Sequence, residues 1–175
     1  MGSFNIYLIG GDCMVRDIIG YMLGLAIFII GIPFIMYFVS GNPNLIQITL
    51  IQWISLILLA IIGMGLSVWS IVYMKNTGKG NPFDAFNHEV APRTSELMTK
   101  GPYGICRNPM LSGVFIFHIG VLIALLSWQS LIIFVIEIIM MNIQVKKEEQ
   151  RLESDFGNDY VEYKKSVNRF SPLKR

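Results

Sequence analysis

Four runs of apolar residues dominate the chain, and polar residues gather between and after them. The first two runs, residues 18–39 and 48–72, carry no charge, and each is long enough to cross the roughly 30 Å hydrocarbon layer of a bilayer as a helix. The shorter runs at 110–126 and 128–145 follow each other closely, which predicts a tight helical hairpin with Trp128 at the membrane interface. The pattern therefore predicts an all-α integral membrane domain with four transmembrane helices.

Glycine and proline positions add detail to the first two runs. Pro33 lies inside the first run, where it is expected to kink the helix because it lacks an N–H group. Gly63 and Gly65 lie inside the second run, and small residues of this kind let a neighbouring membrane helix approach closely.

Basic residues are distributed unevenly along the chain. Of the 14 Lys and Arg residues, Arg16 precedes the first run, five lie between the second and third runs, and eight follow the fourth. The other two connectors, "SGNPNLIQ" and "SWQS", carry none. Because Lys and Arg collect on the cytoplasmic side, both termini, a loop at 75–108 and a tail at 146–175 are expected in the cytoplasm.

Composition agrees with a membrane protein. Mean hydropathy is +0.54 and only 15% of residues are charged. Cys13 and Cys106 form no CxxC pair, so both are expected to be reduced thiols, and with only two histidines no metal site is predicted. His88 is expected to face solvent. The start lacks the features of a secretory signal, and no nucleic-acid partner is expected.

The tail is predicted to be helical and then to break. Gly157 suits the C-terminal cap of a helix that continues the fourth run. Asn158 or Asp159 is expected to begin a second, short helix.

The segment "GPYGICRNPML", residues 101–111, is polar at the edge of an apolar run. Asn108 is a favoured N-cap and Pro109 a favoured first helical residue, so the segment can simply begin the third helix, with Arg107 reaching lipid phosphate. Alternatively, the helix N-terminus and Arg107 form a site for a carboxylate or phosphate.

Two acidic residues, Glu148 and Glu149, follow the fourth run. They can be a solvated helix surface. However, at about 100° per residue, Glu137, Met141, Gln144 and Glu148 share one stripe of the helix, which is typical of a cavity wall.

His118 and Glu137 are the unusual residues inside apolar runs. They lie ten residues before and nine residues after Trp128, so they are expected at similar depth and facing each other. The pair can hold the hairpin together, or it can serve a substrate or a proton.

Residues 78–172 resemble the superfamily of isoprenylcysteine carboxyl methyltransferases and phospholipid methyltransferases, which are integral membrane enzymes. The resemblance rests on a Gly-x-Tyr segment, an Arg-Asn-Pro-Met segment, paired Glu followed by Leu, and a Phe-Gly-x-x-Tyr-x-x-Tyr segment. In this sequence these are Gly101, Tyr103, Arg107, Asn108, Pro109, Met110, Glu148, Glu149, Leu152, Phe156, Gly157, Tyr160 and Tyr163.

The resemblance implies S-adenosylmethionine as methyl donor, held in a cytosol-facing pocket, and a lipophilic acceptor that enters from the bilayer. The side chains present are suited to this donor. Arg107 is suited to bind its carboxylate, Glu148 or Glu149 is suited to bind its ammonium and sulfonium groups, and Tyr103 is suited to stack on its adenine or face its sulfonium. Arg107, Glu148 and Glu149 are therefore the predicted catalytic residues. The full set predicted to bind the cofactor is Leu97, Gly101, Pro102, Tyr103, Arg107, Asn108, Pro109, Met110, Glu148 and Glu149, and the set predicted to contact the acceptor is His118, Glu137, Gln144 and Arg169.

Three positions depart from the family pattern. Asn108 replaces a common His, a variant of prokaryotic members, so a prokaryotic inner membrane is expected. Leu111 replaces a Tyr, which removes one polar contact, and Ser95 replaces a His that some members carry.

The resemblance most favours carboxyl O-methylation of an isoprenylcysteine. Phospholipid N-methylation, an NADPH-dependent membrane reductase of the steroid-reductase type and a non-catalytic lipid-binding protein stay as alternatives. A thermal-shift comparison of S-adenosylmethionine with NADPH separates methyltransferase from reductase.

Overall fold

The computed structural model describes residues 20, 22–41, 43, 48–78, 84–85, 88–89 and 96–172. Predictions for Cys13, Arg16, Ser95 and the side chain of His88 fall outside the described residues. The regular secondary structure of the described residues is helical, apart from the antiparallel two-residue strands β1 (Asp84–Ala85) and β2 (His88–Glu89). In chain order, the helices are η1 (Leu25–Gly31), α2 (Ile32–Val39), α3 (Leu50–Tyr73), η3 (Met74–Gly78), η4 (Gly101–Gly104), α4 (Pro109–Leu125), α5 (Trp128–Phe156) and α6 (Asn158–Ser166).

Three of the described helical segments are long and apolar enough to cross a membrane: Met22–Val39, Leu50–Thr77 and Trp128–Phe156. Helix α4 is apolar but shorter, so the fourth crossing stays a prediction. Many large apolar side chains on the long helices are exposed, as a lipid-facing surface requires. The all-helical membrane class predicted from the sequence is confirmed.

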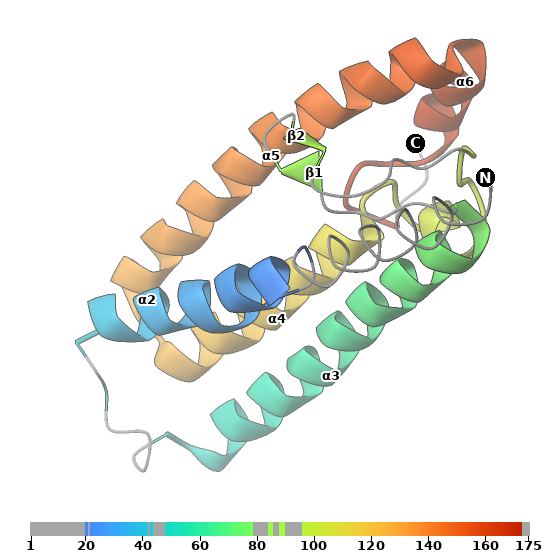
Figure 1. The fold of residues 1–175 in the computed structure, drawn as a ribbon. Coiled ribbons are helices and arrows are strands. Elements are labelled where there is room, and N and C mark those ends of the chain that lie inside the picture. Colours follow the sequence, from blue (N-terminus) through green and yellow to red (C-terminus); the bar gives the residue numbers. More distant parts are fainter. Residues whose placement is uncertain are drawn as a thin grey trace, which may run out of the picture.

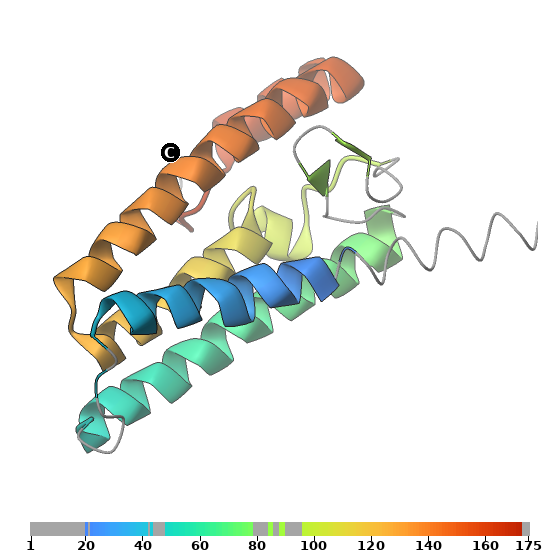
Figure 2. The same ribbon diagram turned by 60° about the vertical axis from the view of Figure 1, so that its left-hand side comes forward.

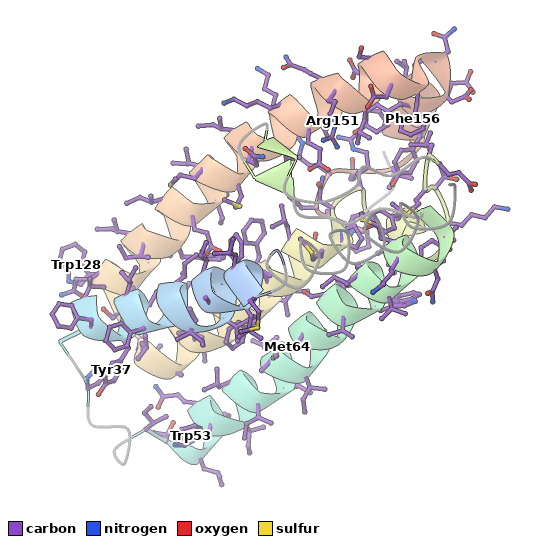
Figure 3. All side chains as sticks on the ribbon, viewed as in Figure 1. Tyr37, Trp53, Met64, Trp128, Arg151 and Phe156 are labelled. Carbon is purple, nitrogen blue, oxygen red and sulfur yellow. The ribbon has the colours of Figure 1, made fainter. Side chains whose placement is uncertain are left out.

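Two tryptophans and a tyrosine lie at one end of the helices, and the charged part of α5 lies at the other. Figure 3 shows Tyr37, Trp53 and Trp128 at one end, and Arg151 and Phe156 at the other. Tryptophan and tyrosine favour the membrane–water interface. This separation agrees with the predicted placement of the basic residues on one side.

Helices α3 and α4 run side by side with their backbones in contact (Figures 1 and 2). A Cβ atom built on Gly63 would lie 2.3 Å from the Gly113 carbonyl oxygen, and one on Gly113 would lie 2.3 Å from the Gly63 carbonyl oxygen. The Ser67 hydroxyl also donates to the Met110 carbonyl oxygen at 2.9 Å. The predicted close approach is confirmed at Gly63 and wrong at Gly65, which faces open space.

The far ends of α3 and α4 are joined by hydrogen bonds. Thr49 and Gln52 form a capping box at the start of α3. The Gln52 side-chain amide also donates to the carbonyl oxygens of Ile123 and Ala124, at 3.3 and 3.2 Å. These carbonyl groups belong to the last turn of α4, where no intrahelical N–H group is available to pair with them.

Pro33 is accommodated in the first helix by a change of hydrogen-bond register. The residues before it form the π-helix η1, and the Ile32 N–H donates to the Ile27 carbonyl oxygen, five residues earlier. Pro33 then lies in the first turn of α2, where a missing N–H group is tolerated.

Helix α5 turns sharply out of α4 and then diverges from it. Leu126 has a left-handed conformation with φ 44°, and Ser127 caps α5 by accepting from the Ser130 N–H. The Ser130 hydroxyl donates to the Met36 carbonyl oxygen of α2 at 2.7 Å. Both views show α5 leaving α4 from this end, so α4 packs along α3 for its length and meets α5 mainly near the turn (Figures 1 and 2).

The tail breaks where the sequence predicts. Helix α5 ends at Phe156, Gly157 follows with φ 55°, and α6 begins at Asn158. After α6, the chain returns to the start of α4, which brings the tail against the loop segment.

Candidate functional site

A cavity of about 460 Å³ lies between the first helix, the start of α4 and the diverging helix α5. Its apolar part is lined by residues of the first helix and by Ile133, Ile136, Met140 and Met141 of α5. Its polar part is lined by Tyr103, Arg107, Glu148 and Glu149. The volume falls within the range of about 300–1,000 Å³ that is usual for small-molecule sites.

The stripe predicted to form a cavity wall does so. Glu137, Met141, Gln144 and Glu148 all line this cavity. The divergence of α5 from α4 exposes that face of α5 to the cavity.

The returning tail fixes the polar segment at the start of α4. The N–H groups of Arg107 and Asn108 donate to the carbonyl oxygens of Asn168 and Arg169, at 2.8 and 3.0 Å. The Ser112 hydroxyl lies 3.1 Å from the Phe170 carbonyl oxygen. Residues about sixty positions apart are therefore held in register, and Arg107 has a defined place in the cavity wall.

Asn108 is the N-cap of α4 and Pro109 its first residue, as predicted. The Asn108 side chain does not cap the helix, because its amide donates to the Arg169 carbonyl oxygen at 3.3 Å. Its role is to hold the tail.

Glu149 is clamped by two arginines. Arg107 Nη2 lies 2.7 Å from Glu149 Oε1, and the side chains of Arg107 and Glu149 are 8% and 5% exposed. Arg169 Nη2 lies 2.5 Å from Oε2, and its Nε donates to Oε1 at 3.1 Å. Asn142 holds Arg169 Nη1 at 3.2 Å. Because both oxygens of Glu149 are engaged, this residue organises the two arginines.

Arg107 keeps one donor free for a ligand. Its Nη1 donates to the Lys164 carbonyl oxygen at 2.9 Å. Its Nε is buried and has no hydrogen-bond partner among the described residues. The Arg107 side chain lines the cavity, and a buried guanidinium N–H without an acceptor suits an incoming carboxylate.

Glu148 lies in the charged part of α5, beyond the apolar segment that ends at Val145. Its side chain is about one-third exposed and pairs with Arg151, whose Nη2 lies 3.8 Å from Glu148 Oε1. Desolvation, and then the negative charge of Glu149, raise the pKa of Glu148 to about 7. Unlike Glu149, Glu148 can therefore offer its carboxylate to a cationic group in the cavity.

Tyr103 is held from both sides. Gly101 has φ 62°, and a Cβ atom added there would lie 2.6 Å from the ring of Tyr73. The ring centroids of Tyr73 and Tyr103 are 6.3 Å apart. The Tyr163 hydroxyl donates to the Tyr103 carbonyl oxygen at 2.6 Å. Burial raises the pKa of both phenols well above the ordinary value, so both stay neutral.

His118 and Glu137 face each other, as predicted. Nδ1 of His118 lies 2.8 Å from Glu137 Oε2, and its Nε2 lies 2.8 Å from the Phe28 carbonyl oxygen. Both side chains are buried, at 0% and 3% exposure.

The structure brings most of the predicted site residues to one cavity. Those that line it are Leu97, Tyr103, Arg107, Asn108, Pro109, Met110, Glu137, Gln144, Glu148 and Glu149. Gly101, Pro102, His118 and Arg169 are not part of its lining. His118 and Arg169 contact the lining residues Glu137 and Glu149. Among the described residues, no group of three or more His, Cys, Asp or Glu side chains could hold a metal ion.

Several lining residues were not predicted as site residues. Gly20, Gly24, Ile27 and Phe28 of the first helix line the cavity, although that helix carries no motif. The four-residue spacing of the two glycines is the weak signal that could have indicated a packed face. Leu111 also lines the cavity, so the wall is apolar where the family pattern has a tyrosine.

The cavity has a polar end and an apolar end. One end offers a free guanidinium N–H, a carboxylate and a tyrosine, and the other end is hydrocarbon with one acid. Such a cavity suits a charged, water-soluble molecule beside a lipophilic one.

Comparison with known proteins identifies the family of the chain. The protein-S-isoprenylcysteine O-methyltransferase of Schizosaccharomyces pombe is 30% identical over 105 residues, which cover 58% of this chain and 44% of that protein. The chain thus spans less than half the length of this curated relative. No solved structure matches the chain. The family model for phospholipid methyltransferases matches residues 50–159, more than half of the chain, and the protein therefore belongs to the phospholipid methyltransferase family.

Proposed function

We propose that the protein transfers a methyl group from S-adenosylmethionine to a lipophilic acceptor inside the membrane. The observation that carries the proposal is the single cavity that joins the Arg107–Glu149–Arg169 cluster to the apolar faces of the first helix and α5. Family membership and the methyltransferase relative support the reaction type.

The polar end fits the methyl donor. The free Nε of Arg107 is placed to bind the donor's carboxylate, and Glu148 offers negative charge to its ammonium or sulfonium. The Tyr103 ring can stack on the adenine or face the sulfonium. Glu149 holds Arg107 in place rather than binding the donor itself.

The chain's residues contribute alignment and exclusion of water. The donor supplies an electrophilic methyl group on a sulfonium, and its transfer is an in-line displacement that needs the acceptor's nucleophile opposite the leaving sulfur. Arg107 and Glu148 fix the donor at one end, and the apolar lining shields the reacting groups from water. Most of the rate gain expected here comes from this positioning.

The acceptor is proposed to enter from the bilayer. Four transmembrane helices, with both termini in the cytoplasm, would put the charged end at the inner membrane surface. Arg151 lies at the end of the helices opposite Trp53 and Trp128, and the excess of Lys and Arg in the loop and tail supports that orientation (Figure 3).

The proposed acceptor class is that of the relative, an isoprenylcysteine carboxylate. The family match favours a second candidate, the amine of a phospholipid. Both present a small nucleophile on an amphiphile.

The test is transfer of label from methyl-labelled S-adenosylmethionine to a total lipid extract or to a prenylcysteine, with products identified by mass spectrometry. We expect labelled lipophilic product and donor binding by calorimetry. NADPH, used as the control ligand, should give no thermal shift. Stabilisation by NADPH but not by S-adenosylmethionine would overturn the proposal in favour of a reductase.

The donor's affinity is expected to depend on pH through Glu148. Because the pKa of Glu148 is about 7, the side chain is largely protonated at about pH 6 and largely ionised at about pH 8. Affinity for S-adenosylmethionine should therefore rise as pH increases through 7, when Glu148 gains the charge that attracts the cation. Calorimetry at several pH values measures this rise.

Glu148→Gln should flatten the pH profile and weaken binding at the alkaline end. Because the pKa of Glu148 is raised, the unliganded fold binds a proton more tightly than the unfolded chain does. The free energy of unfolding should therefore fall as pH rises from about 4.5 through 7. Glu148→Gln lacks this proton, so its free energy of unfolding should fall less over the same pH range. Glu153→Gln, a substitution of a partly exposed residue paired with Lys164, is the matched control. A Glu148→Gln protein that keeps the wild-type pH profile would contradict the assignment.

A further inference from the structure

Glu137 has an oxygen that the structure leaves without a partner. Its Oε2 faces His118, but its Oε1 is buried with no hydrogen-bond partner among the described residues. The residue lines the membrane part of the cavity, and its side chain is 3% exposed. An unpaired acid oxygen in a membrane helix is costly and usually marks a binding site.

The tautomer of His118 follows from its contact with Phe28. In the π-helical register, the Ile32 N–H donates to the Ile27 carbonyl oxygen. Pro33, five residues after Phe28, has no N–H group to continue this pattern. The Phe28 carbonyl oxygen is a pure acceptor at 2.8 Å from His118 Nε2, so Nε2 carries a proton.

The proton on Nε2 leaves two arrangements for the pair. Either neutral His118 accepts at Nδ1 from a protonated Glu137 Oε2, or the doubly protonated ring donates to an ionised Glu137. In both arrangements Glu137 Oε1 carries no hydrogen. It is therefore an acceptor only, and a carboxylate cannot satisfy it, whereas a hydroxyl or N–H group can.

The position of this oxygen separates it from the charged end of the cavity. Glu137 precedes Glu148 by eleven residues, which is roughly 16 Å along a helix. Met140 and Met141 line the cavity between them. A group bound at Glu137 therefore lies within the lipophilic part of a ligand.

We propose that Glu137 Oε1 is a second polar subsite that binds a hydroxyl or N–H group carried within the lipophilic body of the acceptor. The inference rests on the proposed function in taking that ligand to be the methyl acceptor. It narrows the acceptor class, because a plain hydrocarbon or prenyl chain leaves the oxygen unpaired. An amphiphile with a hydroxyl or amide N–H at this depth pairs it.

The test compares two probes of equal chain length, hexadecan-1-ol and its methyl ether, which keeps the oxygen but cannot donate. Apparent dissociation constants are measured from the thermal shift of the full chain in phosphatidylcholine nanodiscs. We expect the wild type to bind the alcohol about tenfold more tightly than the ether. Equal affinity for the alcohol and the ether would mean that the oxygen is hydrogen-bonded to water only, and it would overturn the proposed subsite.

Two variants assign the preference to this oxygen. Glu137→Gln keeps an acceptor oxygen for the probe while its amide N–H donates to His118 Nδ1, so the alcohol preference should persist. Glu137→Met has similar length and no acceptor, so the preference should disappear, and its persistence would refute the assignment. If the Met variant does not fold, the wild-type ratio still tests the preference for a hydroxyl, and loss of that preference in Glu137→Gln would contradict the assignment.

Calorimetry with S-adenosylmethionine on the same proteins separates this inference from the proposed function. A preference for the alcohol without binding of S-adenosylmethionine would contradict the proposed methyltransferase function and support the subsite. Binding of S-adenosylmethionine with equal affinity for the two probes would support the proposed function and contradict the subsite.

Discussion

Arg107→Ala is expected to weaken S-adenosylmethionine binding by about 10- to 100-fold, and to abolish detectable methyl transfer. The reason is the loss of a buried charge-assisted donor, the Nε–H, whose acceptor is proposed to be the donor's carboxylate. Glu149 keeps its contacts with Arg169, so one cation still compensates the buried carboxylate. Isothermal titration calorimetry measures the affinity.

Two further variants control for charge and for folding. Arg107→Lys keeps the positive charge but lacks the Nε donor and the planar fork, so it should resemble the alanine variant in affinity. Lys147→Ala removes an exposed cation two residues from Glu149 and should bind normally. Wild-type affinity in folded Arg107→Ala would show that the donor binds elsewhere.

Gly63→Ala is expected to destabilise the fold by about 1–3 kcal/mol, the usual cost of overpacking. The added Cβ would lie 2.3 Å from the Gly113 carbonyl oxygen and 2.8 Å from the Phe117 nitrogen, so whole helices must separate. Separation would also strain the Ser67–Met110 hydrogen bond. Reversible unfolding in mixed micelles of increasing denaturing detergent measures the change.

Gly65→Ala is the matched control on the same helix. A Cβ on Gly65 meets nothing within 4 Å, and alanine favours a helix over glycine, so stability should hold or rise slightly. Equal losses at both positions would show that helix α3 is sensitive to any added methyl group, and that the Gly63–Gly113 contact is not the cause.

Much of the site could be predicted because its signals are local. Asn108 and Pro109 begin α4 for reasons of capping and fixed φ, and Gly157 ends α5 for reasons of positive φ. The stripe from Glu137 to Glu148 follows from helical periodicity alone, and it does line the cavity. The His118–Glu137 contact followed from similar distances, ten and nine residues, to the turn at Trp128.

Other features depend on contacts between distant residues. The sequence does not predict which of Glu148 and Glu149 is available to bind a ligand, because this depends on the ion pairs that Arg107 and Arg169 both form with Glu149. Gly63 and Gly65 look alike in the sequence, but only one faces α4. Asn108 fits the N-cap, yet its side chain is taken by the returning tail.

The sequence by itself determined the membrane class, the helix boundaries and the family, since hydropathy, capping residues and motif spacing are properties of short stretches of chain. Only the tertiary structure decided that α4 packs on α3 while α5 diverges, and that the first helix closes the cavity. The physical reason is that packing depends on which faces of distant helices fit together: two glycines let two backbones touch, and a proline shifts a helix into a register that leaves one carbonyl for His118.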